Sequence, residues 1–226
     1  MTQQAAALDS IMQEFWGPET TTILDVACGI GTQALGLAQL GYQVTASDLS
    51  HAAVARARRE AAARHLELHC FVADMRHMAV HSQQHYDVVL ACDNAVPHLL
   101  TDEDILTAFR ALYTCVRPGG GCLITVRDYD REDRTGIQVK PHGLRIEGST
   151  RYLLFQVWEF CGTLYELALY CIEDRGGQDG ITRVLRTTYY AIGTKTLIAL
   201  MTQAGFRGVQ RLEERFYQPV LIGTKP

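Results

Sequence analysis

Between residues 22 and 126 the chain alternates short apolar runs with segments whose apolar residues recur every three or four positions. The short runs predict buried strands, and the longer spacing predicts amphipathic helices. Strands that alternate with helices in this way form a parallel sheet with helices on both faces. We expect strands at residues 23–26, 42–47, 67–72, 86–92 and 122–126, and helices at 5–16, 32–40, 52–64 and 101–116.

This alternation of strand and helix patterns ends after residue 126. Residues 130–145 are polar, with Gly, Pro and many charges, and are expected to form a loop. Segments rich in Tyr, Phe, Leu, Val and Thr follow and predict an antiparallel insertion with three strands, at 151–160, 163–173 and 181–190. A helix at 194–204 and two closing strands near 209–215 and 219–223 complete the expected order.

The first predicted strand continues directly into a turn of small residues. Gly29 and Gly31 accept backbone dihedrals that a side chain forbids, and they let a ligand approach the main chain. The helix that begins at Thr32 presents unpaired backbone amides to such a ligand. Asp48 ends the second strand, where a carboxylate can accept hydrogen bonds from ribose hydroxyls. These features predict a nucleotide-type site at the carboxyl edge of the sheet, and they suit both NAD and S-adenosylmethionine.

The run Asp-x-Ala-Cys-Gly-x-Gly, from Asp25 to Gly31, resembles the first motif of class I S-adenosylmethionine-dependent methyltransferases. Ala27 stands where this family usually has its first glycine. Three later strand ends resemble further motifs of the family, and the resemblance covers residues 20–128. It implies S-adenosylmethionine as the cofactor, with S-adenosylhomocysteine as product. The cofactor contacts that it implies are Asp25, Ala27, Gly29, Gly31, Asp48, Leu49, Asp74, Met75, Cys92, Asp93 and Asn94.

The same resemblance implies the fold class. This is an α/β fold with a doubly wound, seven-stranded, mostly parallel sheet, closed by an antiparallel hairpin and carrying a small antiparallel β insertion. We expect a single domain over residues 1–226. Its parts are an N-terminal lid helix (1–20), a cofactor-binding core (21–128), an antiparallel lid (129–190) and the last helix with the closing hairpin (191–226).

The stretch from Asp93 to Leu100 narrows the resemblance to the glycine and sarcosine N-methyltransferase group and its small-molecule relatives. This implies methylation of a nitrogen on a small amine or amino-acid-like acceptor. O- or C-methylation of a phenol, quinol or carboxylate is one alternative. An NAD(P)-dependent reductase is another, although Asp25 and the closing hairpin argue against it.

Candidate catalytic residues follow the fourth and fifth strands. His98 is placed to act as a general base if the acceptor needs one. Arg127 and Tyr129 end the fifth strand, and an arginine there can bind an acceptor carboxylate through two parallel hydrogen bonds. The insertion adds residues that are either pocket walls or ordinary sheet packing. The predicted acceptor contacts are Arg127, Tyr129, Arg151, Gln156, Trp158, Tyr165 and Tyr190.

Composition limits the partners. The chain has 226 residues, 47% of them hydrophobic, and a net charge of −4, which disfavours nucleic acid and anionic membrane. Its seven cysteines form no C-x-x-C pair, as is typical of reduced thiols in a cytoplasmic protein. We expect no membrane span, no signal peptide, and a small-molecule acceptor as the partner. Histidines at 77, 81 and 85 are expected to lie in a loop, and no metal is expected.

Overall fold

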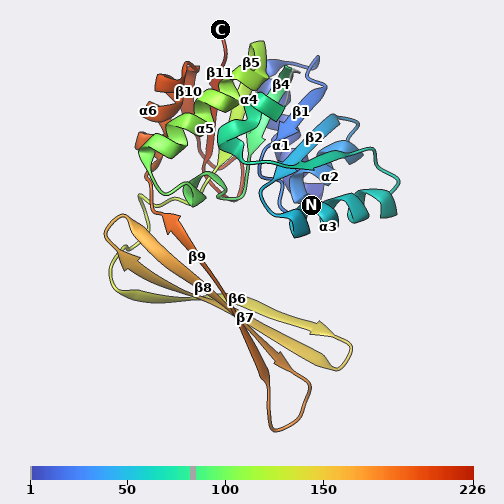
Figure 1. Ribbon diagram of the computed structural model, residues 1–226, viewed down its shortest axis with the longest axis vertical. Helices are drawn as coiled ribbons and strands as arrows, with labels where there is room; N and C mark the ends of the chain where they lie inside the picture. The colour runs from blue at the N-terminus through green and yellow to red at the C-terminus, as the bar shows by residue number, and fades with distance from the viewer. Residues whose placement is uncertain (1, 82–84) are drawn as a thin grey trace. The chain divides into compact units, whose positions relative to one another are not determined.

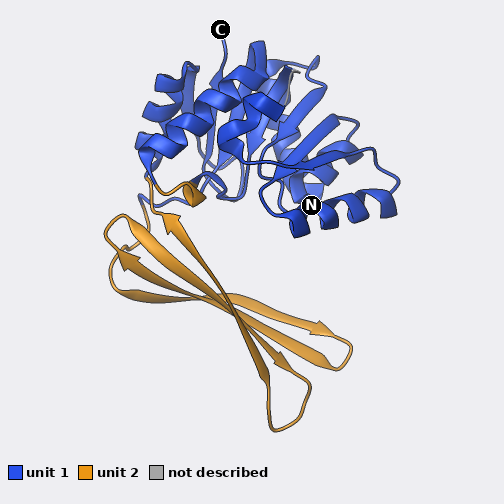
Figure 2. Ribbon diagram, viewed as in Figure 1, with its two compact units in different colours: residues 1–96, 101–130, 193–226 blue, residues 97–100, 131–192 orange. Residues whose placement is uncertain are grey.

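The computed structural model describes residues 2–81 and 85–226. The chain divides into two compact units (Figure 2). Unit 1 comprises residues 1–96, 101–130 and 193–226, and unit 2 comprises residues 97–100 and 131–192. Each unit is described by itself below.

Unit 1 contains a seven-stranded sheet with the order β10-β11-β5-β4-β1-β2-β3 (Figure 1). The strands β1 to β5 pair in parallel, and β11 is antiparallel to both β5 and β10. The predicted fold class, with its closing hairpin, is therefore confirmed. The strands are β1 (Thr22–Asp25), β2 (Gln43–Asp48), β3 (His69–Val72), β4 (Tyr86–Ala91), β5 (Val116–Thr125), β10 (Arg207–Leu212) and β11 (Val220–Thr224).

Six helices and a 3-10 turn surround this sheet among the described residues, and a second 3-10 turn links the two units. Side-chain caps begin two of the helices: Ser50 accepts from the amide of Ala53, and Thr101 accepts from the amide of Asp104. The elements are α1 (Thr2–Trp16), α2 (Thr32–Gln39), α3 (His51–Ala63), η1 (Met75–His77), α4 (Met78–His81), η2 (Val96–His98), α5 (Asp102–Cys115) and α6 (Thr194–Ala204).

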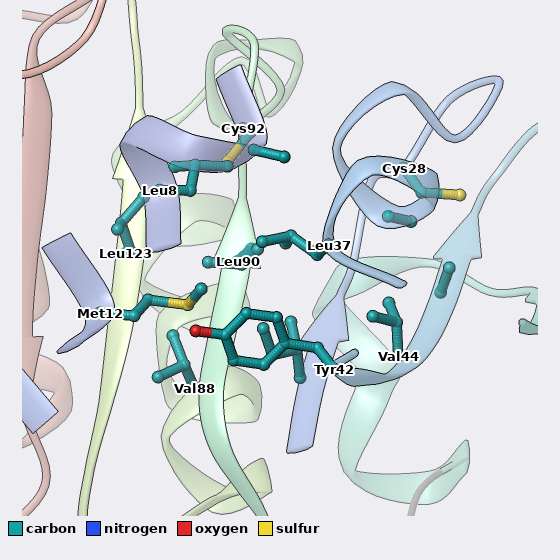
Figure 3. Packing of buried hydrophobic residues seen from close by; sticks show 14 of the residues in the cluster. Leu8, Met12, Cys28, Leu37, Tyr42, Val44, Val88, Leu90, Cys92 and Leu123 are labelled. Carbon is teal, nitrogen blue, oxygen red and sulfur yellow. The ribbon is translucent and has the colours of Figure 1, made fainter. Parts of the chain in front are cut away.

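The core of unit 1 joins α1 to the centre of the sheet (Figure 3). Leu8 and Met12 of α1 are fully buried and belong to one cluster with Val88 and Leu90 of β4 and Leu123 of β5. Burying such side chains stabilises the fold by about 1.5–3 kcal/mol each. The buried face of the predicted lid helix is thus part of the core of unit 1.

The strand β5 begins earlier than the sequence predicts. We expected the glycines at 119–121 to end a helix, with the strand starting at 122, but β5 begins at Val116. Gly121 lies in this strand because a side chain there would overlap the ring of Trp16. The indole of Trp16 also donates to the hydroxyl of Thr224 in β11 at 3.1 Å. The glycine is therefore a packing requirement inside the strand.

Unit 2 is a four-stranded antiparallel sheet with the order β6-β7-β8-β9. Its strands are β6 (Ile137–Glu147), β7 (Thr150–Cys161), β8 (Leu164–Asp174) and β9 (Ile181–Tyr190). The expected loop at 130–145 is wrong, because β6 pairs with β7 along its whole length. Apolar and polar residues alternate from Ile137 to Lys140, and a register shift between Pro141 and Gly143 interrupts that alternation.

The histidine-rich stretch also differs from its prediction as a loop. Residues 75–81 form η1 and α4, which places His77 and His81 in helical turns. Residues 82–84 of this stretch lie outside the described residues. Over residues 2–81 and 85–226, no group of three or more His, Cys, Asp and Glu side chains is placed to hold a metal ion.

Candidate functional site

The glycine turn after β1 leaves its backbone open at one point and tightly packed at another. Gly29 has a φ of 55° and Gly31 a φ of 90°, both in the left-handed region that favours glycine. A side chain on Gly31 would press against Leu35 and Ala57, at 3.2 and 3.3 Å. A side chain on Gly29 would meet no atom within 4 Å. Gly31 therefore serves the packing of α2, while Gly29 is the point at which a ligand can approach the main chain.

Asp48, at the end of β2, forms a hydrogen bond with this turn. One carboxylate oxygen accepts from the amide of Gly29 at 2.9 Å, and the other accepts from the amide of Ser50 at 2.8 Å. Both oxygens keep a second lone pair for a further donor. The ends of β1 and β2, which the sequence analysis assigned to one ligand, are thus adjacent. The carboxylate of Asp48 is held in place without a bound ribose.

Asp25 is a buried acid without a partner. Its side chain is 1% exposed, and neither carboxylate oxygen has a hydrogen-bond partner within the described part of the chain. Burial raises the pKa of this carboxyl to about 7; the nearby Ala27 amide opposes the rise and the charge of Asp48 adds to it. Buried polar groups are normally satisfied, so an orphaned one at a strand end suggests a ligand donor. The α-ammonium group of S-adenosylmethionine is such a donor, and the residues present therefore fit this cofactor.

Asp74 is held by an arginine that the sequence analysis did not consider. The guanidinium of Arg76 donates to both oxygens of Asp74, at 2.6 to 3.1 Å, and also to Asp104 at 2.9 Å. The hydrogen bonds from Arg76 hold the pKa of Asp74 below its ordinary value. Any adenine amino group must share this carboxylate with Arg76. Leu49 is 70% exposed at the end of β2, as an apolar wall for a ligand would be.

The loop after β4 carries backbone strain. Asp93 and Asn94 have φ values of 57° and 65°, and two consecutive residues other than glycine in this region are costly. The hydroxyl of Tyr217 donates to Asp93 Oδ1 at 2.7 Å, and the hydroxyl of Thr125 accepts from the Asp93 amide at 2.7 Å. Thr125 in turn donates to Gln218 at 2.9 Å. The surrounding strands thus hold the loop in one conformation.

Tyr217 and Gln218 are site residues that the sequence analysis missed. They precede β11, far beyond the predicted motifs in the sequence. Burial and the hydrogen bond to Asp93 raise the pKa of Tyr217 well above its ordinary value, so its hydroxyl remains a donor at neutral pH. An aromatic residue before the last strand carries no motif, and no pattern in the sequence could have assigned it.

Tyr129 supports this loop from the interior. Its side chain has no exposed surface, and the side-chain Nδ2 of Asn94 donates to its hydroxyl at 2.8 Å. The oxygen of Asn94 also accepts from the backbone amide of Arg127 at 3.0 Å. This geometry suits a positioning role for Tyr129. The side chain of Arg127 is half-buried at the end of β5.

The insertion brings together an aromatic group that differs in part from the predicted one. The ring of Tyr165 lies 5.0 Å from that of Trp158 and stacks on Tyr189 at 5.4 Å. His98 packs on the same Tyr189 at 4.1 Å. The predicted Tyr190 pairs with Leu164 instead, and the pleat puts it on the opposite face of the sheet. Trp158 also donates to Gln156, at 2.9 Å.

Arg151 is separated from this aromatic group. It lies seven residues before Trp158 along β7, a distance of about 23 Å at ~3.3 Å per strand residue. Its guanidinium forms an ion pair with Asp174 at 2.6 Å. The structure therefore does not bring Arg151 into one pocket with Trp158 and Tyr165.

Comparison with known proteins agrees with this geometry. The family model described as "Methyltransferase domain" matches residues 23–120, which include the glycine turn and the strand ends after β1 to β4. Residues 23–120 thus match a methyltransferase domain. The predicted resemblance and its cofactor are thereby confirmed.

The methyltransferase domain has curated relatives with different acceptors. It is 31% identical over 110 residues to a glycine/sarcosine N-methyltransferase of Parasynechococcus marenigrum, which covers 49% of this chain and 39% of that protein. It is 34% identical over 113 residues to a ubiquinone biosynthesis O-methyltransferase of Alkalilimnicola ehrlichii, covering 50% and 44%. The chain thus spans less than half of the length of these relatives.

One similar solved structure follows the whole chain, including the insertion. It is an amino pentose methyltransferase from Micromonospora echinaspora bound to S-adenosylmethionine. Its TM-score is 0.82 at 19% identity, with 100% of this chain and 91% of that chain covered. This likeness shows a shared fold. Among the described residues, no helix is long and apolar enough to cross a membrane.

Proposed function

We propose that the protein transfers a methyl group from S-adenosylmethionine to the nitrogen of a small cationic amine. The carboxylate of Asp93 carries this proposal. It is exposed at the carboxyl end of β4, and the hydroxyl of Tyr217 donates to its Oδ1. A fixed carboxylate at this edge attracts an ammonium group and repels a phenolate.

The proposed chemistry needs orientation more than activation. The bound cofactor supplies a methyl group that is already activated on a sulfonium. The ammonium group first loses one proton to solvent. The lone pair of the neutral amine would then form the N–C bond while the C–S bond breaks and that electron pair passes to sulfur, which gives an N-methylated ammonium product. Asp93 Oδ2 accepts a remaining N–H, which turns the lone pair away from the carboxylate. Positioning of this kind is worth about 7–11 kcal/mol when the reactive geometry is held well.

In this mechanism Tyr217 is a positioning residue. Its hydroxyl fixes Oδ1 of Asp93 and leaves Oδ2 for the acceptor. Arg127, half-buried at the end of β5, gives a second point of attachment if the acceptor also carries a carboxylate. Together these groups favour a small acceptor with an amine and a second polar group, as in an amino acid or an amino sugar.

The comparisons give this proposal independent support. One similar structure that spans the whole chain is an amino pentose methyltransferase, and a curated relative is a glycine/sarcosine N-methyltransferase. Both of these proteins are named for acceptors that carry an amino group. The O-methyltransferase relative supports the alternative, a small hydroxylated acceptor. That reaction needs a general base, for which His98, with its Nδ1 at 3.4 Å from the hydroxyl of Thr187, is the candidate.

The test uses pairs of acceptors that differ only in the nucleophile. The purified protein is incubated with S-adenosylmethionine and matched amines and alcohols or phenols built on amino acid, amino sugar and benzyl scaffolds. Mass spectrometry then detects the addition of one methyl group. We expect turnover of amines and none of their hydroxyl partners. Turnover confined to hydroxyl compounds would contradict the nitrogen assignment.

Two variants test the role of Asp93. Asp93→Asn keeps a residue that tolerates a positive φ but removes the charge, and should lower kcat/KM for amines about 10- to 100-fold, as expected for a lost hydrogen bond to a charged group. Tyr217→Phe should lower it about 3- to 10-fold, because it removes one hydrogen bond to the carboxylate. Asp179→Asn, an equal change of charge in an exposed turn of unit 2, is the control. Titration with S-adenosylhomocysteine separates acceptor effects from lost cofactor binding.

A further inference from the structure

One face of the unit 2 sheet is largely apolar over β6, β7 and β8, and the edge strand β9 adds one valine to it. Residues paired in an antiparallel register point to the same side, so the register defines the members of this face. We call it the apolar face. It consists of Val139, Leu144, Ile146, Leu153, Phe155, Val157, Ala168, Tyr170, Ile172 and Val184.

Much of the apolar face is open to solvent in the single chain. Val139 is 65% exposed, Leu144 60% and Leu153 46%. At its centre the rings of Phe155 and Tyr170 stack across neighbouring strands, with centroids 4.8 Å apart. Soluble monomers rarely leave contiguous apolar patches beyond a few hundred Å² uncovered. The face therefore has the character of an interaction surface.

The size of the apolar face suits a stable interface. Four strands of ten to twelve residues cover about 600–700 Å², from ~3.3 Å per residue and ~4.8 Å between strands. A standard interface takes about 800 Å² from each partner. One whole sheet face is thus close to what a partner must supply.

Four charged residues, joined in two ion pairs, lie at the edges of the apolar face. Arg151 pairs with Asp174 at 2.6 Å near one end, and Arg186, beside Ala168 on the edge strand β9, pairs with Glu166 at 2.8 Å. An apolar centre with a charged rim is the usual anatomy of a protein interface. A surface that binds anionic membrane needs an excess of Lys and Arg, which these pairs do not provide.

We infer that the apolar face packs against the same face of a second copy of this chain. Two copies of one sheet have the same right-handed twist, and sheets with the same twist pack face to face at about 10 Å with their strands nearly aligned. A two-fold axis needs only one self-complementary patch. The resulting β-sandwich buries the Phe155–Tyr170 stack of each copy in the middle of the interface.

Sedimentation equilibrium of the full chain from about 0.1 to 100 µM tests this inference directly, over the affinity range typical of such interfaces. We expect a dimer that dissociates on dilution. A protein that stays monomeric throughout this range would overturn the inference, whichever substrate it methylates. The result does not depend on the proposed acceptor, because mass in solution is measured without turnover.

Paired substitutions on the two faces of the same sheet locate the interface. Leu144→Lys places a charge on the apolar face, whereas Leu185→Lys places one at an equally exposed leucine on the opposite face. The first should raise the dimer dissociation constant at least 100-fold, and the second should change it less than threefold. Retention of the dimer in Leu144→Lys would contradict the inference. Ile146→Lys repeats the test if that variant does not fold, as judged by its melting curve.

Discussion

The two units are both built on sheets but use them in opposite ways. Unit 1 buries its sheet on both faces: Val88 and Val89, which point to opposite sides of β4, both have no exposed surface. Unit 2 is a single layer in which Leu144 and Leu185, on opposite faces, are both more than half exposed. Helices cover the first sheet because parallel strands need helical crossovers, whereas hairpins connect the second without covering it. The stability of unit 1 comes from its own core, and unit 2 keeps surface available for other molecules.

Replacing one leucine by alanine in each sheet tests this difference most strongly. Leu90→Ala in β4 should lower the free energy of unfolding by about 2–5 kcal/mol, because the cavity is enclosed on both sides. Leu185→Ala in β9 should change it by less than about 0.5 kcal/mol, because most of the side chain is already in water. Chemical denaturation of both variants is the measurement. Equal losses would show that the two sheets are supported alike.

Two glycines with similar backbone conformations, one in each unit, test which unit binds the cofactor. Gly29 and Gly162 have φ values of 55° and 64°, and a side chain on either would meet no protein atom within 4 Å. Gly29→Val should weaken S-adenosylhomocysteine binding more than 100-fold, about 2.7 kcal/mol, because the added atoms occupy the approach to the turn. Gly162→Val carries the same backbone strain and should leave that affinity unchanged. Calorimetric titration distinguishes them, and equal losses would remove Gly29 from the site.

Asp48 tests the contacts that follow this turn. Asp48→Ala should weaken S-adenosylhomocysteine by about 1.5–3 kcal/mol, the usual cost of losing hydrogen bonds to a charged acceptor. It also frees the amide of Gly29, which Asp48 holds at 2.9 Å. The same titration measures the loss, with Asp179→Ala in unit 2 as the control. Unchanged affinity in a folded Asp48→Ala protein would contradict the placement of the cofactor.

The buried acid of unit 1 predicts how stability varies with pH. Burial raises the pKa of Asp25 to about 7 from an ordinary 3.8, so the folded protein holds this proton more tightly than the unfolded chain does. The contribution of this carboxyl to the free energy of unfolding is therefore complete below about pH 4, and it is lost as the pH rises to 7. Asp25→Asn should remove that loss. Melting curves of the wild type and of Asp25→Asn from pH 4 to 8 are the measurement. The stability of the variant relative to the wild type should increase with rising pH. A difference that stays constant would contradict the assignment.

The smallest effect is expected at Arg151. Arg151→Lys should leave methyl transfer unchanged within about twofold, because its guanidinium is committed to an exposed pair with Asp174, worth about 0–1 kcal/mol. Arg127→Lys should lower kcat/KM for acceptors that carry a carboxylate, since the two-point contact is lost. Steady-state kinetics on carboxylated and uncarboxylated amines separates the two. A larger loss from Arg151→Lys would bring that end of the insertion into the site.

Much of unit 1 could be predicted from the sequence because its signals are local. A strand buried on both faces appears as an unbroken apolar run, and the glycines at 29 and 31 mark a turn that only glycine makes easily. The strand ends share one edge because parallel strands meet there, so their acids could be grouped before any contact was known. The strand β6 escaped prediction because a shift at Pro141 breaks its alternation.

The tertiary structure alone decided which side chains of the site meet. Tyr217 lies 124 positions from Asp93 in the sequence and still forms a hydrogen bond with it. Arg76 forms hydrogen bonds with Asp74, the carboxylate that the resemblance assigned to the adenine amino group. A one-residue difference in register puts Tyr189, rather than Tyr190, on the face of Trp158. The periodicity of a sequence determines which element forms and which of its faces is apolar. Contacts between distant elements depend on register and packing, which no local pattern contains.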